Sequence, residues 1–232
     1  MSRLVFSSGD FATNRIAVEP PFAVPFDLWT YLGTSAPASP NLVTGTALGV
    51  GGTPVWSPNY ATLTPAVNHL TPTGVLDVAD QTFLFVARTQ QSGGFWSPII
   101  SGYAGGVGLM IGLGWNYARI HPSGLSGLIN HVFAGNYGLD WSFWSVVLDS
   151  GGAIPITVKN WTFVQTVTGG TASAPRTNLG QQLTLAGHSA SNGTYASDMA
   201  FAAHTPSIMT DDQIAQSYLS VKLQLAGLGM LV

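Results

Sequence analysis

The pattern of apolar and polar positions divides this chain into a long series of short strands and one terminal helix. From about residue 42, short apolar runs end repeatedly at Gly, Pro or Asn, as strands joined by tight turns do. Gln81 to Arg88 and Ser197 to His204 are apolar on both faces, so we expect buried strands there. Residues 154–159 alternate instead, which predicts a half-buried strand, and Pro155 within it indicates an edge or a bulge.

The last thirty residues predict a helix over about 210–226. Thr210 and Gln213 have the spacing of a capping box, in which each side chain bonds the backbone of the other residue. Gly227 is the expected end of the helix. We expect the helix to pack on the strands through residues that recur at helical spacing on one face: Ile214, Tyr218, Val221 and Leu225.

About ten strands and a single helix indicate one antiparallel sandwich rather than a propeller or a solenoid. No repeat with a period of 20 to 50 residues is visible in the sequence. The remaining strands are expected at 107–113, 115–120, 142–149, 161–168 and 182–187. We therefore predict an all-β, antiparallel jelly-roll β-sandwich over residues 41–232, closed by the short C-terminal helix.

Residues 1–40 differ from the rest and predict an extended N-terminal arm. Prolines interrupt residues 19–26, which argues against a helix or a central strand there. Large apolar residues between the prolines argue against a solvated linker. The arm should therefore lie on another surface, its own sandwich or a neighbouring molecule, and we expect intermolecular contacts through Pro21, Phe22, Val24 and Phe26.

The order of the motifs in residues 60–226 resembles that of the concanavalin A-like lectin/laminin-G-like superfamily. Such domains end with an aromatic-led strand, a D-G-G type turn, an alternating strand, an L-x-l-G strand, an a-x-x-A-f strand and an l-t-d-x-q-I helix. This chain offers, in that order, Trp144 to Val147, Asp149 to Gly152, Ile154 to Val158, Leu183 to Gly187, Met199 to Ala202 and Met209 to Ile214. The glycine that usually follows the alternating strand is absent, because Asn160 runs directly into Trp161. The resemblance implies a jelly-roll fold and lectin-like binding.

The composition excludes several classes of partner. Charged residues make up only 7% of the chain against 46% hydrophobic, and the net charge is −3. The seven Lys and Arg residues form no basic stripe, so we expect no nucleic-acid partner. No apolar run is long enough to cross a bilayer, so we expect no membrane insertion. The absence of cysteine excludes disulfides and thiolate metal sites.

A charge-poor surface has two explanations that the sequence leaves open. It is typical of robust secreted or particle-borne β-proteins, and it also fits a surface covered by neighbours in an assembly. No signal peptide is visible after Arg3. Together these features favour a virion component that is made in the host cytoplasm and assembles with itself, for which we expect a trimer, and with other virion proteins.

Catalytic and metal sites are not expected. Glycoside hydrolysis needs two carboxyl groups about 5 to 10 Å apart, and the only glutamate, Glu19, lies in the arm. The candidate aspartates Asp140, Asp149 and Asp198 stand singly at strand ends or turns. A calcium site is suggested only by residue type at Asp140, Asp149 and Asn160. We predict no catalytic residue, no metal and no cofactor.

The most ligand-like residues join aromatic rings to amide and charged groups. Sugars stack their apolar faces on aromatic rings, while amides and carboxylates bond the hydroxyls. Residues 121–140, which are rich in Gly and Asn, resemble a binding loop. The alternative is that the tryptophans only pack in the core or between subunits. The candidate glycan-binding residues are Trp115, Asn116, Tyr117, Arg119, Asn136, Tyr137, Asp140 and Trp141.

The sequence thus leads to one principal functional hypothesis and one alternative. The principal hypothesis is a non-enzymatic structural protein of a tailed bacteriophage virion, in a tail, baseplate or decoration position, with host-surface glycan as a further ligand. The alternative is a polysaccharide-degrading enzyme or its carbohydrate-binding module.

Overall fold

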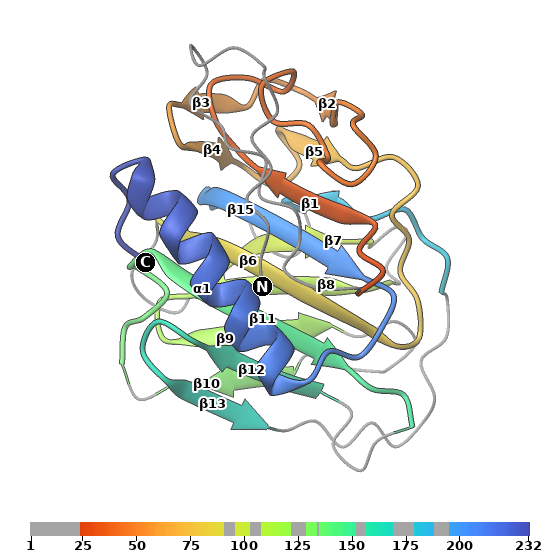
Figure 1. Cartoon of the computed structure of the whole chain (residues 1–232), viewed down its shortest axis with the longest axis vertical. Coiled ribbons are helices and arrows are strands. Elements are labelled where there is room, and N and C mark those ends of the chain that lie inside the picture. Colours follow the sequence, from red (N-terminus) through yellow and green to blue (C-terminus); the bar gives the residue numbers. More distant parts are fainter. Residues whose placement is uncertain are drawn as a thin grey trace, which may run out of the picture.

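Two antiparallel β-sheets pack face to face with one α-helix on the outside of the sandwich in this computed structural model (Figure 1). The structure describes residues 24–90, 96–102, 108–121, 129–133, 135–151, 156–168, 179–187 and 195–232. Within these residues the first sheet has eight strands and the second has seven. The predicted all-β, jelly-roll-like sandwich with a C-terminal helix is confirmed.

The first sheet runs in the order β13-β12-β11-β6-β15-β4-β3, with β1 also paired to β15. Its central strands β6 and β15 pair antiparallel over almost their whole length, with one register shift between Met199 and Phe201. The bounds are β1 Leu28–Tyr31, β3 Val55–Ser57, β4 Tyr60–Leu63, β6 Gln81–Thr89, β11 Ser142–Leu148, β12 Ile156–Asn160, β13 Gln165–Thr168 and β15 Ser197–Thr205.

The second sheet runs in the order β10-β9-β8-β7-β14-β5-β2. Its centre is the pair β7 and β8, which shifts register between Pro98 and Ile100. The bounds are β2 Gly49–Gly51, β5 His69–Thr71, β7 Trp96–Ser101, β8 Met110–Gly114, β9 Tyr117–His121, β10 Ile129–Val132 and β14 Thr184–Leu185.

The core between the sheets is built from alternate positions of the central strands. Phe83, Phe85 and Ala87 of β6 face inward, and Trp144 of β11 joins them. Because successive side chains of a strand point to opposite faces, Leu84 and Val86 of β6 face outward. Both faces of β6 are buried, so the expectation of a central strand from its two-sided apolar sequence is confirmed.

The helix α1, Asp211–Gly227, lies across the outer face of the first sheet (Figure 1). Its buried residues Ile214, Val221 and Leu225 join the cluster formed by the outward-facing side chains of the sheet. The predicted capping box is present: Gln213 N–H donates to Thr210 Oγ1 at 3.3 Å, and Thr210 N–H donates to Gln213 Oε1 at 2.8 Å. The predicted position of the helix and the face that it packs against the sheet are therefore confirmed.

The helix ends at the expected glycine, but the left-handed residue that closes it lies two positions later. Gly227 is the last helical residue, and Gly229 adopts the left-handed conformation with a φ of 79°. The amide of Met230 then donates to the carbonyl of Leu225 at 2.9 Å, which closes the last turn. Gly229, rather than Gly227, supplies the positive φ that stops the helix.

The predicted boundary of an arm at residue 40 is wrong for residues 24–40, which belong to the sandwich. Strand β1 pairs with β15 in the register Leu28 to His204 and Tyr31 to Phe201. Trp29 is fully buried, with Phe26 and Phe201 packed edge-on at 5.0 Å each. The large apolar residues of this segment therefore fill the outer-face cluster of this molecule.

Of the four residues predicted to anchor the arm, the structure describes two. Phe26 is buried and Val24 packs against the same cluster as α1. Pro21 and Phe22 lie outside the described residues, so an arm over residues 1–23 stays a prediction.

Hydrogen bonds fix the entry of the chain into β1. Asp27 Oδ1 and His204 Nδ1 are 2.6 Å apart, and His204 Nε2 lies 2.9 Å from Gln81 Oε1. Gln81 Nε2 in turn donates to Asp77 at 2.6 Å. This buried network ties residue 27 to both central strands.

Two smaller expectations for strands are wrong. Of the two alternatives for the strand at 154–159, the edge strand is wrong, because β11 pairs with one side of β12 and β13 with the other. The bulge stays a prediction, because Pro155 lies outside the described residues. The expected strand over 161–168 is divided, because 161–164 form the turn between β12 and β13. Among the described residues, no helix has both the length and the apolar character that crossing a membrane requires.

Candidate functional site

A tryptophan, a tyrosine and an arginine meet on the outer face of the first sheet. Trp141 precedes β11 and its ring centroid lies 5.3 Å from that of Tyr60, which begins β4. The guanidinium carbon of Arg88, from β6, lies 4.7 Å from the Trp141 ring centroid and 6.0 Å from that of Tyr60. Guanidinium groups bind aromatic faces in this way, so Arg88 and Trp141 hold each other in place.

A buried carboxylate fixes the arginine from the other side. Asp198 of β15 is 1% exposed and accepts a hydrogen bond from Arg88 Nε at 2.9 Å. Its other oxygen accepts from Thr62 Oγ1 and from Gln90 Nε2, each at 2.7 Å. The carboxylate thus has partners on both oxygens, as a buried charge requires.

A cleft of about 430 Å³ opens beside Trp141, between the edge of the sheet and the end of α1. This volume lies within the range of small-molecule sites. Two aromatic rings, Trp141 and Phe163, line the cleft, and Asp140 and Lys222 provide an exposed carboxylate and an exposed amine. The other lining residues are Thr162, Ala226, Met230, Leu231 and Val232.

The loop that presents Asp140 and Trp141 is held by backbone hydrogen bonds. Ser142 Oγ lies 3.2 Å from the carbonyls of Tyr137 and Asp140, to which it donates. The amide of Gly138 donates to the carbonyl of Trp115 at 2.9 Å. A Cβ at Gly138 would lie 1.9 Å from the carbonyl oxygen of Gly114, so only glycine permits this approach.

The turn that carries Phe163 is equally constrained. Phe163 N–H donates to Asn160 Oδ1 at 3.1 Å, and the ring of Phe163 stacks on Tyr137 with a centroid distance of 4.6 Å. Thr162 Oγ1 accepts from the amide of Phe143 at 2.9 Å. Val164 completes the turn with a φ of 53°, a strained conformation for a β-branched residue. Both aromatic walls are therefore positioned before any ligand binds.

The far wall of the cleft is the C-terminal tail. Asn59 Nδ2 donates to the carbonyl of Leu228 at 2.8 Å, which anchors the tail to the turn before β4. Lys222 Nζ lies 3.0 Å from Tyr218 Oη and 5.2 Å from the centre of the same ring. Lys222 is thereby held at the mouth of the cleft.

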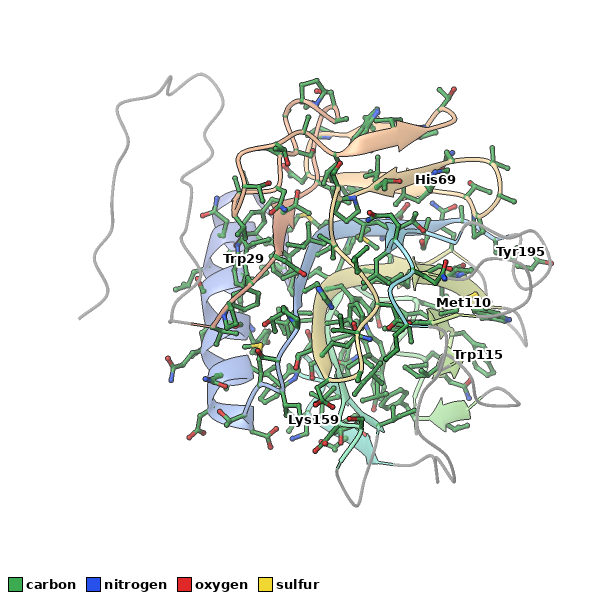
Figure 2. The ribbon with its side chains drawn as sticks, turned by 90° about the vertical axis from the view of Figure 1, so that its right-hand side faces the viewer. Trp29, His69, Met110, Trp115, Lys159 and Tyr195 are labelled. Carbon is green, nitrogen blue, oxygen red and sulfur yellow. The ribbon has the colours of Figure 1, made fainter. Side chains whose placement is uncertain are left out.

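The structure divides the predicted glycan-binding residues between two sides of the molecule. Trp115 packs with Trp96 and Met110 on the second sheet, on the side opposite α1 (Figure 2). Its neighbour Asn116 has its backbone carbonyl bonded to the amide of Phe133 at 2.8 Å. A backbone hydrogen bond from Gly138 to the carbonyl of Trp115 links Trp115 to the other group.

The second group gathers at the cleft. Asp140 and Trp141 line it, and Tyr137 supports Phe163 from behind. Asn136 is exposed on the same loop, and its carbonyl accepts from the amide of Leu139. Tyr117 and Arg119 lie in β9, and their side chains are outside what the structure describes.

Sequence reasoning missed the residues that form the other walls of the cleft. Phe163 was assigned to a strand, although the Asn160-Trp161-Thr162 run without a glycine marked an unusual loop. Lys222 is one of only two lysines, which was a usable signal. Nothing in the sequence marked Ala226 or Met230, because their place beside Trp141 depends on how α1 crosses the sheet.

The acidic residues singled out from the sequence lie apart. Asp140 precedes β11 and Asp149 follows it, so they flank opposite ends of a seven-residue strand. Asp149 accepts from the amide of Gly151 within its own turn, and Asn160 is 1% exposed. Asp140, Asp149 and Asn160 therefore cannot share a calcium ion. Among the described residues no group of three His, Cys, Asp or Glu side chains is placed to hold a metal.

Comparisons with known proteins place the fold among binding domains of bacterial toxins and related sandwiches. No family model matches the sequence, and a search of curated proteins found no match. Among solved structures, the binding domain of botulinum neurotoxin DC in complex with SialylT superimposes with a TM-score of 0.60 at 15% identity, over 84% of this chain and 51% of that chain. The binding domain of serotype G gives a TM-score of 0.63 at 9% identity, again over 84% and 51%.

A sialidase of Trypanosoma rangeli, in complex with sialic acid, is a further neighbour. Its TM-score is 0.60 at 12% identity, over 88% of this chain and 34% of that chain. The chain thus spans about half the length of the toxin domains and about a third of the sialidase. At these identities the comparison shows the fold alone, a two-sheet β-sandwich.

Proposed function

We propose that this chain is a non-enzymatic, glycan-binding sandwich domain, with the cleft beside Trp141 as its binding site. The observation that carries the proposal is the pairing of two fixed aromatic rings, Trp141 and Phe163, with two exposed charged groups, Asp140 and Lys222, in one cleft. Sites of this kind combine a mostly apolar lining with a few polar groups that orient the ligand.

The chemistry of the cleft fits a sugar ring. The apolar face of a pyranose packs on an aromatic ring, and hydroxyl groups around its edge both donate and accept hydrogen bonds. The carboxylate of Asp140 accepts only and the ammonium group of Lys222 donates only. Their presence at one cleft allows a neutral sugar to satisfy both.

Binding is favoured over hydrolysis by the carboxyl groups present. Asp140 is the only acidic side chain among the lining residues, whereas glycosidases generally use two. Asp198 is buried, accepts hydrogen bonds on both oxygens and is not among the residues that line the cleft. The alternative of a polysaccharide-degrading enzyme thus gains no support from this geometry.

The names of the structural neighbours support glycan as the ligand class. One toxin domain is described with SialylT, another toxin is described as depending on two ganglioside molecules for cell entry, and the sialidase holds sialic acid. One toxin domain is also described in complex with a protein, rat synaptotagmin II.

The decisive experiment is a glycan array followed by calorimetry on the best ligand. Trp141→Ala and Asp140→Asn should each weaken binding at least about tenfold, since each removes a direct contact worth roughly 1.4 kcal/mol or more. Trp115→Phe, on the opposite side of the molecule, is the matched control and should bind normally. Binding that Trp115→Phe abolishes and Trp141→Ala preserves would move the site to the second sheet.

The enzymatic alternative is tested on the same ligands. A reducing-sugar assay should detect no product from any glycan that the array identifies. Turnover that is lost in Asp140→Asn would replace the binding function with a hydrolytic one.

We further propose, on the sequence alone, a place for this domain in a bacteriophage virion. The support is the charge-poor composition of the chain. Self-association, with a trimer expected, and contacts with other virion proteins stay predictions. Mass photometry of the full chain tests the first, because a monomer at micromolar concentration would contradict it.

A further inference from the structure

The solvent side of α1 carries large apolar residues that the sandwich does not cover. Leu219 is 57% exposed and Leu223 is 75% exposed. Leu223 is four positions after Leu219, so the two side chains are neighbours on the helix surface. We call this pair the leucine stripe. Ile208, before the helix, and Leu231, after it, are exposed as well. Single exposed leucines are ordinary, but four exposed apolar residues along one helix and its flanks indicate a surface that another segment covers.

The chain outside the described residues begins beside this helix. Val24 packs against the same apolar cluster as α1. The carbonyl of Pro25 accepts a hydrogen bond from Thr205 Oγ1 at 3.1 Å, and Thr205 lies only six residues before the start of α1. The described chain therefore begins, at residue 24, beside the segment that leads into α1.

The sequence of this segment suits an extended contact with the stripe. Ile16, Val18 and Phe22 are apolar at even-numbered positions, and Pro20 and Pro21 favour an extended backbone. Alternate residues of an extended chain are roughly 6.6 Å apart, and residues four apart on a helix are about 6 Å apart. Eight extended residues reach roughly 26 Å, which is about the length of a 17-residue helix.

We propose that residues 16–23 cover the leucine stripe of the same molecule. The anchor at Val24 gives the segment a high effective concentration at α1, which favours this contact over one with another molecule. The two prolines reduce the entropy lost when the segment becomes ordered. The sequence by itself predicts that the arm contacts another molecule. The position of Val24 beside α1 instead favours a contact between the arm and the helix of the same molecule. Leu219 and Leu223 are not among the residues that line the glycan cleft, so each of the two proposals can fail without the other.

The first test measures how accessible the stripe is in the full chain. The protein has no cysteine, so Leu223→Cys introduces a single thiol whose labelling rate reports on exposure. Adding the substitutions I16D, V18D and F22D should speed labelling roughly tenfold. The three carboxylates should release the segment from the leucine stripe, so the population in which the thiol at position 223 is accessible increases. Val132→Cys, in β10 of the other sheet and 61% exposed, is the control and should label equally in both backgrounds. Equal rates at Leu223→Cys would overturn the proposal.

The second test asks which molecule supplies the segment. Val18→Cys combined with Leu223→Cys should form a disulfide on mild oxidation, since a bond requires the two Cβ atoms within about 4.5 Å. A disulfide within a monomer supports the proposal. A disulfide-linked dimer, or no disulfide, overturns it. This measurement needs no acidic substitutions, so it decides the question even if the triple variant fails to fold.

Discussion

Replacing Ile214 by alanine tests the docking of α1 on the sandwich. Ile214 is fully buried and belongs to the cluster that includes Phe143 and Phe201 of the first sheet. The substitution removes three carbon atoms from this cluster. At about 0.8 kcal/mol for each buried methylene, the transfer term alone is roughly 2.4 kcal/mol.

The cavity adds to this cost. Rigid neighbours cannot collapse into the space that the side chain leaves, and the cluster to which Ile214 belongs includes aromatic rings that pack on one another. Phe143, for example, stacks near Tyr218 at 5.3 Å and near Phe201 at 6.2 Å. We therefore expect a loss of unfolding free energy of about 2 to 4 kcal/mol, within the range measured for such truncations.

Urea denaturation followed by circular dichroism measures the change, and Gln216→Ala is the control. Gln216 lies on the exposed side of the same helix, so its truncation should change stability by less than about 0.5 kcal/mol. For a domain of this size a loss of 3 kcal/mol corresponds to a melting temperature lower by roughly 6 to 12 °C. An unchanged midpoint for Ile214→Ala would refute the docking of α1 at this position.

Four further outcomes follow from the structure. Burial raises the pKa of the Tyr31 phenol above its usual value. The unfolded chain therefore loses the phenol proton at lower pH than the folded chain, and the free energy of unfolding should fall as pH rises above about 10. Tyr31→Phe should make the difference in this free energy between pH 9 and pH 11 smaller, as measured by urea denaturation. Asp198→Ala should cost about 2 to 4 kcal/mol, because it leaves Arg88 without its carboxylate, and a loss below 1 kcal/mol in the same titration would contradict this. Val164→Gly should raise stability by up to about 1 kcal/mol by relieving the positive φ, and a lower melting temperature would count against strain there. Deleting residues 1–38 should abolish the folded circular dichroism spectrum, because β1 is removed, and a retained spectrum would show that β1 is dispensable.

The fold class was predictable from local sequence patterns, but the first strand of the sandwich, β1, was not. The two-sided apolar run of β6 and the capping box of α1 each depend on a few neighbouring residues, and both were confirmed. Strand β1 was missed because its apolar residues follow a proline-rich stretch, and its partner β15 lies about 170 residues away in sequence. A strand defined by so distant a partner has no local signature beyond its hydrophobicity.

The candidate site was predictable only in part for the same reason. Asp140 and Trp141 stood out by residue type, and they line the cleft. Trp115 was grouped with them because it lies nearby in sequence, yet its ring packs with Trp96 and Met110. Sequence proximity does not determine which sheet a residue joins: Trp115 lies between β8 and β9 of the second sheet, whereas Trp141 precedes β11 of the first.

The length of α1 determines where the site lies. Along β6 the outward positions read Leu84, Val86 and Arg88, and the helix covers the first two as part of its apolar cluster. Near the C-terminal end of α1, the same face of the sheet carries the arginine, its partner Asp198 and the exposed rim of Trp141. A longer helix would bury this surface and would require apolar residues there. The stop at Gly229 therefore leaves Asp140, Lys222 and the rim of Trp141 open, and these are the groups on which the proposed glycan site depends.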